Sequence, residues 1–145
     1  MLHDDAGAQE LQATLNVLMP IRRQRLIRSE RQLREAEHDL SAIDTQIRQH
    51  QEQLQVLRQA CQQQRDAFDT QTMGQRQTLD DLKMQLEDER KALSHIEQEI
   101  QRGHAYQQQH HLQQQQIGQA RETVRQCQKA VEKLEFLLTL HQEDV

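Results

Sequence analysis

Three histidines in the second half of the chain are the side chains with the clearest capacity for chemistry. His104, His110 and His111 could bind a metal ion, but a site on a helix needs two imidazoles four residues apart so that both point one way. No two histidines of the sequence have that spacing. We therefore interpret these three as solvated polar residues and expect no metal and no other cofactor.

Cysteines and paired acids offer little more. Cys61 and Cys127 are too few and too far apart for a disulfide framework or a zinc knuckle. Asp80 and Asp81 are adjacent carboxylates, but on an exposed helix such a pair is solvated charge. The sequence also has no glycine-rich phosphate loop, no nucleophile elbow and no dinucleotide-binding fingerprint. We therefore predict that the chain is not an enzyme.

A basic cluster follows the single proline, Pro20, and only Glu30 interrupts it. It consists of Arg22, Arg23, Arg25, Arg28, Arg31 and Arg34. At about 100° per residue these side chains point round most of a helix, whereas a helix that binds nucleic acid or a membrane more often gathers its cations on one face. Two interpretations stay open: a solvated helix surface, or an end of the molecule that sits in an acidic socket.

Composition indicates which elements must carry these residues. Hydrophobic types make up 34% of the 145 residues and aromatic types 2%, too few for an ordinary compact domain. Good helix formers dominate, which favours helices over disorder. The net charge of -5 argues against nucleic acid and anionic lipid as main partners. Because neither a membrane-spanning run nor a signal peptide is recognisable, we expect a cytoplasmic protein.

Apolar residues recur at intervals of seven, which is typical of a coiled coil. The first run consists of Leu26, Leu33, Leu40, Ile47, Leu54, Cys61 and Phe68, with Ala36, Ile43 and Leu57 beside it. The second run has Leu79, Leu86, Leu93 and Ile100 in one column, and Leu82, Ile96, Ile117, Val124, Val131 and Leu138 in the other. Toward its end a column of Ala120, Cys127, Leu134 and His141 takes over, which predicts a drift of the stripe.

Between the two runs lies Thr70 to Gln75, with Gly74 almost at the midpoint. Glycine suits the left-handed residue that ends a helix. We therefore predict an all-α fold: a long two-helix antiparallel coiled-coil hairpin with a short N-terminal helical segment. It would be a monomer with a single elongated domain over 1–145, helix one over about 20–69, a turn over about 70–76 and helix two over about 77–142. One continuous helix in a parallel dimer stays open as the alternative.

Three places weaken or extend the pattern. Gln107, His110 and Gln114 occupy predicted seam positions, so we expect a loosely packed stretch of helix two rather than a disordered insertion. Pro20 predicts a boundary or kink near Met19, with the preceding segment forming a short helix opposite residues 130–137. The closing stretch AVEKLEFLLTL has more apolar residues than one seam can cover, so part of it should contact a partner.

With these residues in view, the chain resembles the small stalk proteins of bacterial type III secretion, the YscO and HrpO group, which is related to the flagellar export protein FliJ. The resemblance covers nearly the full length. It lies in the entry helix PIRRQRLIRSERQLREAE, a central turn approached through RDAF, a return TLDDLKMQLEDERKAL and a closing AVEKLEFLL.

The resemblance implies two partners for one stalk. The end that carries both termini would enter the hexameric secretion ATPase, through Arg22, Arg23, Arg25, Arg28, Lys129 and Lys133. The turn end would contact the cytoplasmic ring of the export gate, near Leu57, Phe68, Leu79 and Leu82. Chaperones of exported proteins are a further implied partner. Two other classes remain: a coiled-coil chaperone that clasps its clients, and a generic dimeric scaffold.

Overall fold

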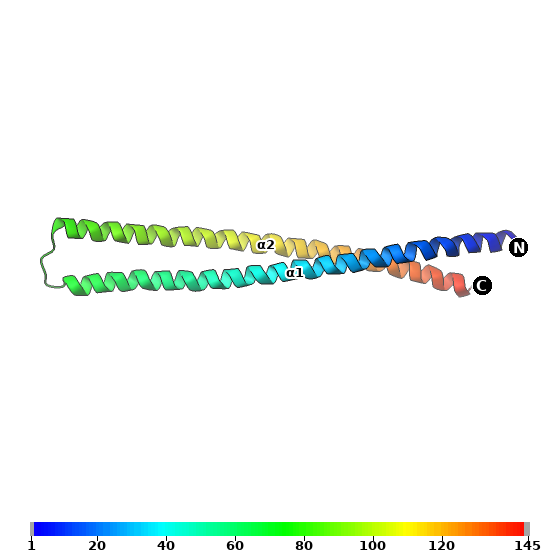
Figure 1. Cartoon of the computed structure of the whole chain (residues 1–145), viewed down its shortest axis with the longest axis horizontal. Coiled ribbons are helices and arrows are strands. Elements are labelled where there is room, and N and C mark those ends of the chain that lie inside the picture. Colours follow the sequence, from blue (N-terminus) through cyan, green and yellow to red (C-terminus); the bar gives the residue numbers. More distant parts are fainter. Residues whose placement is uncertain (1, 144–145) are drawn as a thin grey trace. The chain divides into compact units, whose positions relative to one another are not determined.

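The computed structural model describes residues 2–143, and it is all-α over that range. Helix α1 runs from Leu2–Thr72 and helix α2 from Leu79–Glu143, in antiparallel directions (Figure 1). The two helices pack against each other, which confirms the predicted antiparallel helical hairpin. Neither helix contains a stretch long and apolar enough to cross a membrane.

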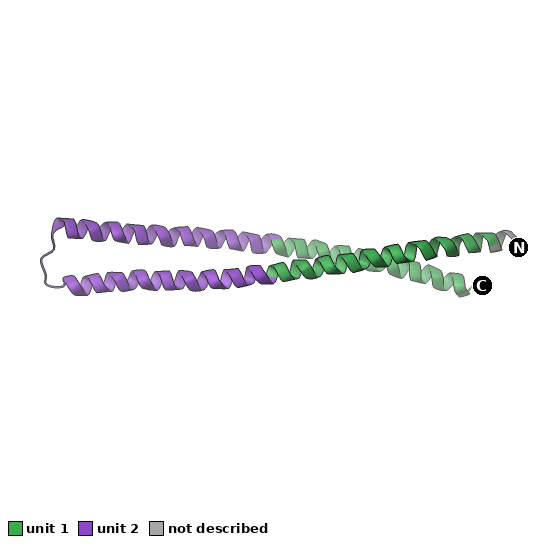
Figure 2. Ribbon diagram, viewed as in Figure 1, with its two compact units in different colours: residues 1–40, 113–145 green, residues 41–112 purple. Residues whose placement is uncertain are grey.

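The described chain forms two compact units, and each contains a part of both helices (Figure 2). Unit 1 combines the start of α1, up to residue 40, with the end of α2, from residue 113 onward. Unit 2 comprises residues 41–112 and therefore contains the connection between the helices. Every contact discussed below lies within one of these units.

Unit 1 has an apolar core. Leu15 and Met19 of α1 are buried against Val131 and Leu134 of α2, and Leu18, Leu26 and Leu138 pack around them. Burying a side chain of this size stabilises a fold by roughly 1.5–3 kcal/mol, so each of these four residues contributes substantially to the stability of the unit. The segment before Pro20 therefore lies against residues 130–137, as the sequence predicts.

Pro20 lies inside α1, and the expected helix boundary near Met19 is wrong. Proline cannot donate the backbone hydrogen bond to the residue four positions earlier, which costs about 3 kcal/mol in a helix interior. Leu15 and Met19 lie just before it, and both are almost fully buried. A helix that broke here would lose that burial, so tertiary packing overrides the local preference of proline.

The predicted seam of α1 is correct. Every residue of its main column, from Leu26 to Phe68, is partly buried at intervals of seven, and Ala36, Ile43 and Leu57 lie on the same face. Two polar residues complete that second column at the same interval, and both are buried: Ser29 and His50. The Ser29 hydroxyl donates a hydrogen bond to the Leu26 carbonyl oxygen at 2.8 Å, which satisfies it inside its own helix.

The seam of α2 differs from the prediction in its first half. The stripe does not drift: the column of Ala120, Cys127 and Leu134 continues backward at intervals of seven. Its earlier members are Gln113, Tyr106, Glu99, Ala92 and Gln85, all partly buried. One residue further along the helix from positions of this column are Leu79, Leu86 and Leu93. Their side chains therefore point about 100° away from those of the column. They are therefore about half exposed or more, as is Leu82, which lies near the start of α2.

The predicted loose stretch of α2 is helical throughout. Of the three polar residues expected on the seam, His110 is partly buried, while Gln107 and Gln114 are exposed. Gln113 faces α1 instead, and its side-chain amide donates a hydrogen bond to the carbonyl oxygen of Ala36 at 2.9 Å. A long glutamine side chain thus reaches a backbone acceptor on the neighbouring helix.

The connection between the helices depends on Gly74 and Thr78. Gly74 has a φ of 74°, a left-handed conformation that side chains with a Cβ rarely adopt. The Thr78 hydroxyl accepts a hydrogen bond from the backbone N–H of Asp81 at 3.1 Å, so Thr78 caps α2. Asp80 and Asp81 lie in the first turn of α2, where the helix dipole interacts favourably with negative charge.

Two glycine substitutions test these backbone roles. Gly74→Ala should lower the free energy of unfolding by about 1 kcal/mol because alanine is strained at positive φ. Gly118→Ala should raise it by about 0.5–1 kcal/mol, since Gly118 is helical and a Cβ there meets open space. Urea unfolding followed by circular dichroism measures both. Equal effects of the two substitutions would contradict the assigned turn.

Candidate partner-binding surfaces

A basic groove lies in unit 1 between the start of α1 and the end of α2. Its lining includes four cations, two from each helix: Arg22, Arg25, Lys129 and Lys133. Cys127 and Ala130, both partly buried, lie between them. The Arg22 guanidinium also donates a hydrogen bond across the groove to the Ala130 carbonyl oxygen at 3.3 Å. The structure therefore brings together four of the six cations that the resemblance implies at the ATPase.

The other two cations are not part of this lining. A guanidinium nitrogen of Arg23 lies 3.7 Å from a carboxylate oxygen of Glu135, and both side chains are about half exposed. This pair joins α1 to α2 with the modest strength of a surface ion pair. Arg28 is exposed and does not line the groove.

One carboxylate close to the groove is held in its charged form. The Arg125 guanidinium lies 2.6 Å from a carboxylate oxygen of Glu122, and this hydrogen-bonded pair lowers the pKa of Glu122 below its ordinary value. The charge of Lys129 lowers that pKa further. Arg125 therefore supplies the main counter-charge for Glu122, and Lys129, which lines the groove, contributes less.

Apolar side chains remain uncovered at the end of α2. Phe136, Leu137 and Leu140 are all exposed in unit 1, although Leu18 packs against the nearby core. The excess of apolar residues expected there is therefore real in the described structure. These three side chains continue the same stretch of α2 that carries Lys129 and Lys133.

The residues predicted at the gate end divide into two kinds. Leu57 and Phe68 are partly buried on the α1 seam of unit 2, where they help to hold the helices together. Leu79 and Leu82 are 67% and 48% exposed, so both side chains can reach a partner. The expectation that these two leucines are buried on the seam is wrong. Leu79 lies outside the packed heptad columns, whereas Leu82 shares the column of Ile96 and Ile117 but is exposed near the start of α2.

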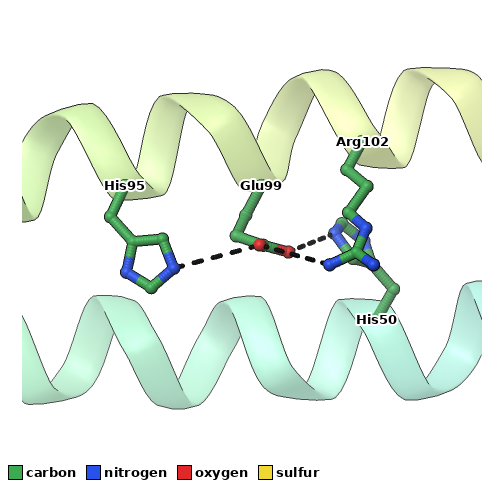
Figure 3. Close-up of polar contacts among 4 residues, drawn as sticks. All are labelled: His50, His95, Glu99 and Arg102. Carbon is green, nitrogen blue, oxygen red and sulfur yellow. Dashed lines mark ion pairs between the residues drawn. The ribbon is translucent and has the colours of Figure 1, made fainter.

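The interior of unit 2 contains a polar cluster around Glu99 (Figure 3). Nε2 of His50, on α1, lies 3.2 Å from Oε2 of Glu99, on α2. The contact suits an ion pair when the imidazole is protonated, but it lacks the alignment of a hydrogen bond. His95 and Arg102 approach the other carboxylate oxygen at 3.9 and 3.6 Å.

Gly103 makes room for the buried imidazole. A Cβ built at Gly103 would lie 2.9 Å from Cε1 of His50, closer than such atoms approach in practice. The ring of Tyr106 packs edge-on against His50, with the ring centroids 5.4 Å apart. His50 is only 7% exposed. Glycine is therefore required in this helix interior because a neighbouring side chain fills its space.

A second histidine contact joins the helices of unit 2. Nε2 of His110 lies 2.8 Å from Oδ1 of Asp44, so His110 is not the solvated residue that the sequence predicts. Among residues 2–143, no three histidines, cysteines or carboxylates are grouped closely enough to hold a metal ion. Cys61 and Cys127 are free thiols, one in each unit.

Sequence reasoning missed His50 and Glu99 as interior residues. The available signal was the spacing of Ala36, Ile43 and Leu57, because the missing member of that column is His50. Its polar character hides it from a search for apolar residues alone. The isolated glycine at position 103, within an otherwise helical run, was a second signal of a close approach.

Because of the Gly103–His50 contact, we expect Gly103→Ala to lower the free energy of unfolding, whereas Gly118→Ala should raise it. Gly103→Ala should be at least about 1 kcal/mol less stable than Gly118→Ala, because the new methyl group displaces a buried ring. In a His50→Ala background the same substitution should stabilise the chain instead. A double-mutant cycle from urea unfolding measures the coupling. Additive effects would show that His50 does not occupy this space.

The described surfaces consist of a cationic groove, exposed leucines beside the turn, and an apolar end of α2. Charge and apolar area of this kind suit the binding of other proteins. No family model matches the chain, and the comparisons with curated proteins and with solved structures found no similar protein.

Proposed function

We propose that this chain is a non-enzymatic, cytoplasmic stalk and assembly component of a bacterial type III secretion export apparatus. It links the hexameric secretion ATPase to the cytoplasmic ring of the export gate, and handling of export chaperones is a further role. The observation that carries the proposal is the convergence of Arg22, Arg25, Lys129 and Lys133 on one groove. These residues come from the two segments, far apart in the sequence, for which the resemblance implies contact with the ATPase.

The unequal surface of unit 1 supports this role. The groove carries four cations on one side of the helix pair, whereas Arg23 and Arg125 are paired with carboxylates. A stalk with an uneven charge distribution, inside a nearly symmetric ring, interacts differently with each ATPase subunit. Such a difference biases one subunit at a time, so the stalk influences ATP hydrolysis without any catalytic group of its own.

Leu79 and Leu82 supply the proposed contact with the export gate. Both are exposed in unit 2 and lie in the first turns of α2. Exposed leucines on a helix are suited to an apolar depression on a partner, because their burial upon binding is favourable. Leu57 and Phe68 support this surface indirectly by joining the helices behind it.

A second candidate function is a coiled-coil chaperone, and a specific observation favours it. Met73, in the connection between the helices, is 80% exposed, and Met84, near the start of α2, is 67% exposed. Flexible apolar side chains of this kind bind unfolded clients with little specificity. A chaperone would suppress the light scattering of an aggregating client protein. The stalk would leave that aggregation unchanged.

Charge reversal in the groove tests the ATPase contact. Arg22→Glu combined with Arg25→Glu should return the hydrolysis rate of a hexameric type III secretion ATPase to near its unstimulated value, because the ring would lose its cationic contact. The measurement is phosphate release with and without the chain. Lys83→Glu with Lys91→Glu, the same charge change in unit 2, is the control and should still stimulate hydrolysis.

Circular dichroism must show that both variants keep their helicity. Full stimulation by the Arg22/Arg25 variant, with its helices intact, would remove the support for this function. Absence of stimulation by the unaltered chain would remove it as well.

A single exposed leucine tests the gate contact. Leu79→Glu should weaken binding to the isolated cytoplasmic ring of an export gate about tenfold, because an apolar contact becomes a charge. Its free energy of unfolding should change by less than about 0.5 kcal/mol, as expected for an exposed side chain. Val56→Glu is a matched control, since Val56 is 65% exposed in the same unit and Leu79 is 67% exposed. Equal binding by both variants would exclude Leu79 from the contact.

A further inference from the structure

The cationic groove of unit 1 lacks a counter-charge of its own. Among the described residues, its lining combines Arg22, Arg25, Lys129 and Lys133 with Gln126, Cys127 and Ala130, and it contains no carboxylate. Cations three or four residues apart on one helix face repel each other by a few tenths of a kcal/mol. The groove brings two such pairs together, so an anionic ligand that enters it relieves the repulsion within and across both helices.

Nearby carboxylates are engaged elsewhere. Glu135 contacts Arg23 at 3.7 Å, and Glu122 contacts Arg125 at 2.6 Å. Glu37, further along α1, lies 3.9 Å from a guanidinium nitrogen of Arg121. These ion pairs place three acids of unit 1 in contact with arginines outside the groove lining, and only Glu122 also interacts, more weakly, with a groove cation, Lys129.

The spacing of the cations matches a helical ligand. Arg22 and Arg25 are three residues apart on α1, and Lys129 and Lys133 are four apart on α2, so each pair spans about one helical turn. Carboxylates three or four residues apart on a ligand helix are separated by the same 5–6 Å or so. Cys127 and Ala130 have small side chains, which leave space between the two rows of cations for such a helix.

A nucleic acid is a poorer fit. Its phosphates continue in both directions, whereas the cations of the groove lining span only about one turn of each helix. The net charge of the chain is also -5, which repels a long polyanion. The groove thus favours a short anionic segment about two turns long over a continuous phosphate backbone.

We infer that the groove binds an acidic helical segment of a partner protein, whose carboxylates lie one turn apart and pair with Arg22 and Arg25 on one side and Lys129 and Lys133 on the other. The inference rests on the proposed function in one respect only: that function would make the secretion ATPase the source of the segment. The chemistry of recognition depends on the groove alone.

A synthetic peptide tests the inference without any ATPase. The probe is a fluorescein-labelled, alanine-based helical peptide with four glutamates, arranged as two pairs that lie on neighbouring flanks of one helix face, with the members of each pair four residues apart. It is titrated with the full chain and followed by fluorescence anisotropy. A peptide with glutamine in place of glutamate should not bind. A peptide of equal charge, with its glutamates spread round the whole helix, should bind more weakly. A single-stranded oligonucleotide of equal charge provides the comparison with a different anion.

Lys129→Glu combined with Lys133→Glu should weaken binding of the acidic peptide about tenfold, because two favourable charge pairs become repulsive. Both lysines are exposed, so this variant should keep its helicity. The matched control is Lys83→Glu with Lys91→Glu in unit 2, which should bind within about twofold of the unaltered chain.

Cys127 provides an independent report of where the peptide binds. In a Cys61→Ser background, saturating peptide should slow the reaction of Cys127 with a maleimide several-fold, because this thiol lies in the groove lining. In a Cys127→Ser background, the reaction of Cys61 should not change, since Cys61 lies in unit 2. Unchanged reactivity of Cys127 with peptide bound would place the peptide elsewhere and overturn the inference.

The inference also fails if the Lys129/Lys133 variant binds the peptide as tightly as the unaltered chain does, or if the oligonucleotide binds better than the peptide. Its failure is distinguishable from that of the proposed function. Peptide binding without ATPase stimulation would retain the groove site and reject the secretion role. ATPase stimulation without peptide binding would retain that role and reject the acidic helical ligand.

Discussion

The fold depends on a single heptad phase along α2. The residues that face α1 recur at intervals of seven from Gln85 to His141, without the drift expected from the apolar residues. A helix in a two-stranded coiled coil has to present the same stripe to its partner over its whole packed length. Each residue in that phase therefore enters the interior whatever its polarity. As a result, the interior is apolar in unit 1 and partly polar in unit 2.

In unit 1 this phase selects Leu134, and the second column of the seam adds Ile117, Val124 and Val131; all four are buried. In unit 2 the same phase selects Gln85, Glu99 and Tyr106, and α1 adds His50. Glu99 lies within ion-pair distance of His50 across the helices, and Gly103 leaves space for the imidazole. The apolar residues one position away are left on the surface. Exposed leucines and a polar interior in unit 2 are thus two consequences of one constraint.

The sequence predicts the fold correctly because two long heptad runs with a central glycine have few other ways to bury their apolar faces. Gly74, the α1 seam and the core opposite residues 130–137 are all foreseeable from spacing. Pro20 was misjudged because local preference carries no information on the burial of Leu15 and Met19. The phase of α2 was misjudged because Leu79, Leu86 and Leu93 form a more hydrophobic column than the one that packs.

The candidate site was only partly predictable. Arg22, Arg25, Lys129 and Lys133 were expected at one end of the molecule, but the sequence could not separate them from Arg23 and Arg28. That separation depends on which arginine reaches Glu135 and which reaches the backbone of Ala130. Such choices are set by side-chain positions on two helices at once. A linear pattern of charges does not contain them.

Because the two interiors differ, the free energy needed to separate the helices locally also differs between the units. Fully buried apolar side chains hold unit 1 together, whereas unit 2 combines apolar side chains that are only partly buried with polar contacts that exchange more readily with water. Thermal fluctuations that part the helices briefly therefore require less free energy in unit 2. Backbone amides of residues 41–112 would be the first to exchange their hydrogens with solvent, and a binding protein that inserts between the helices would meet the least resistance there.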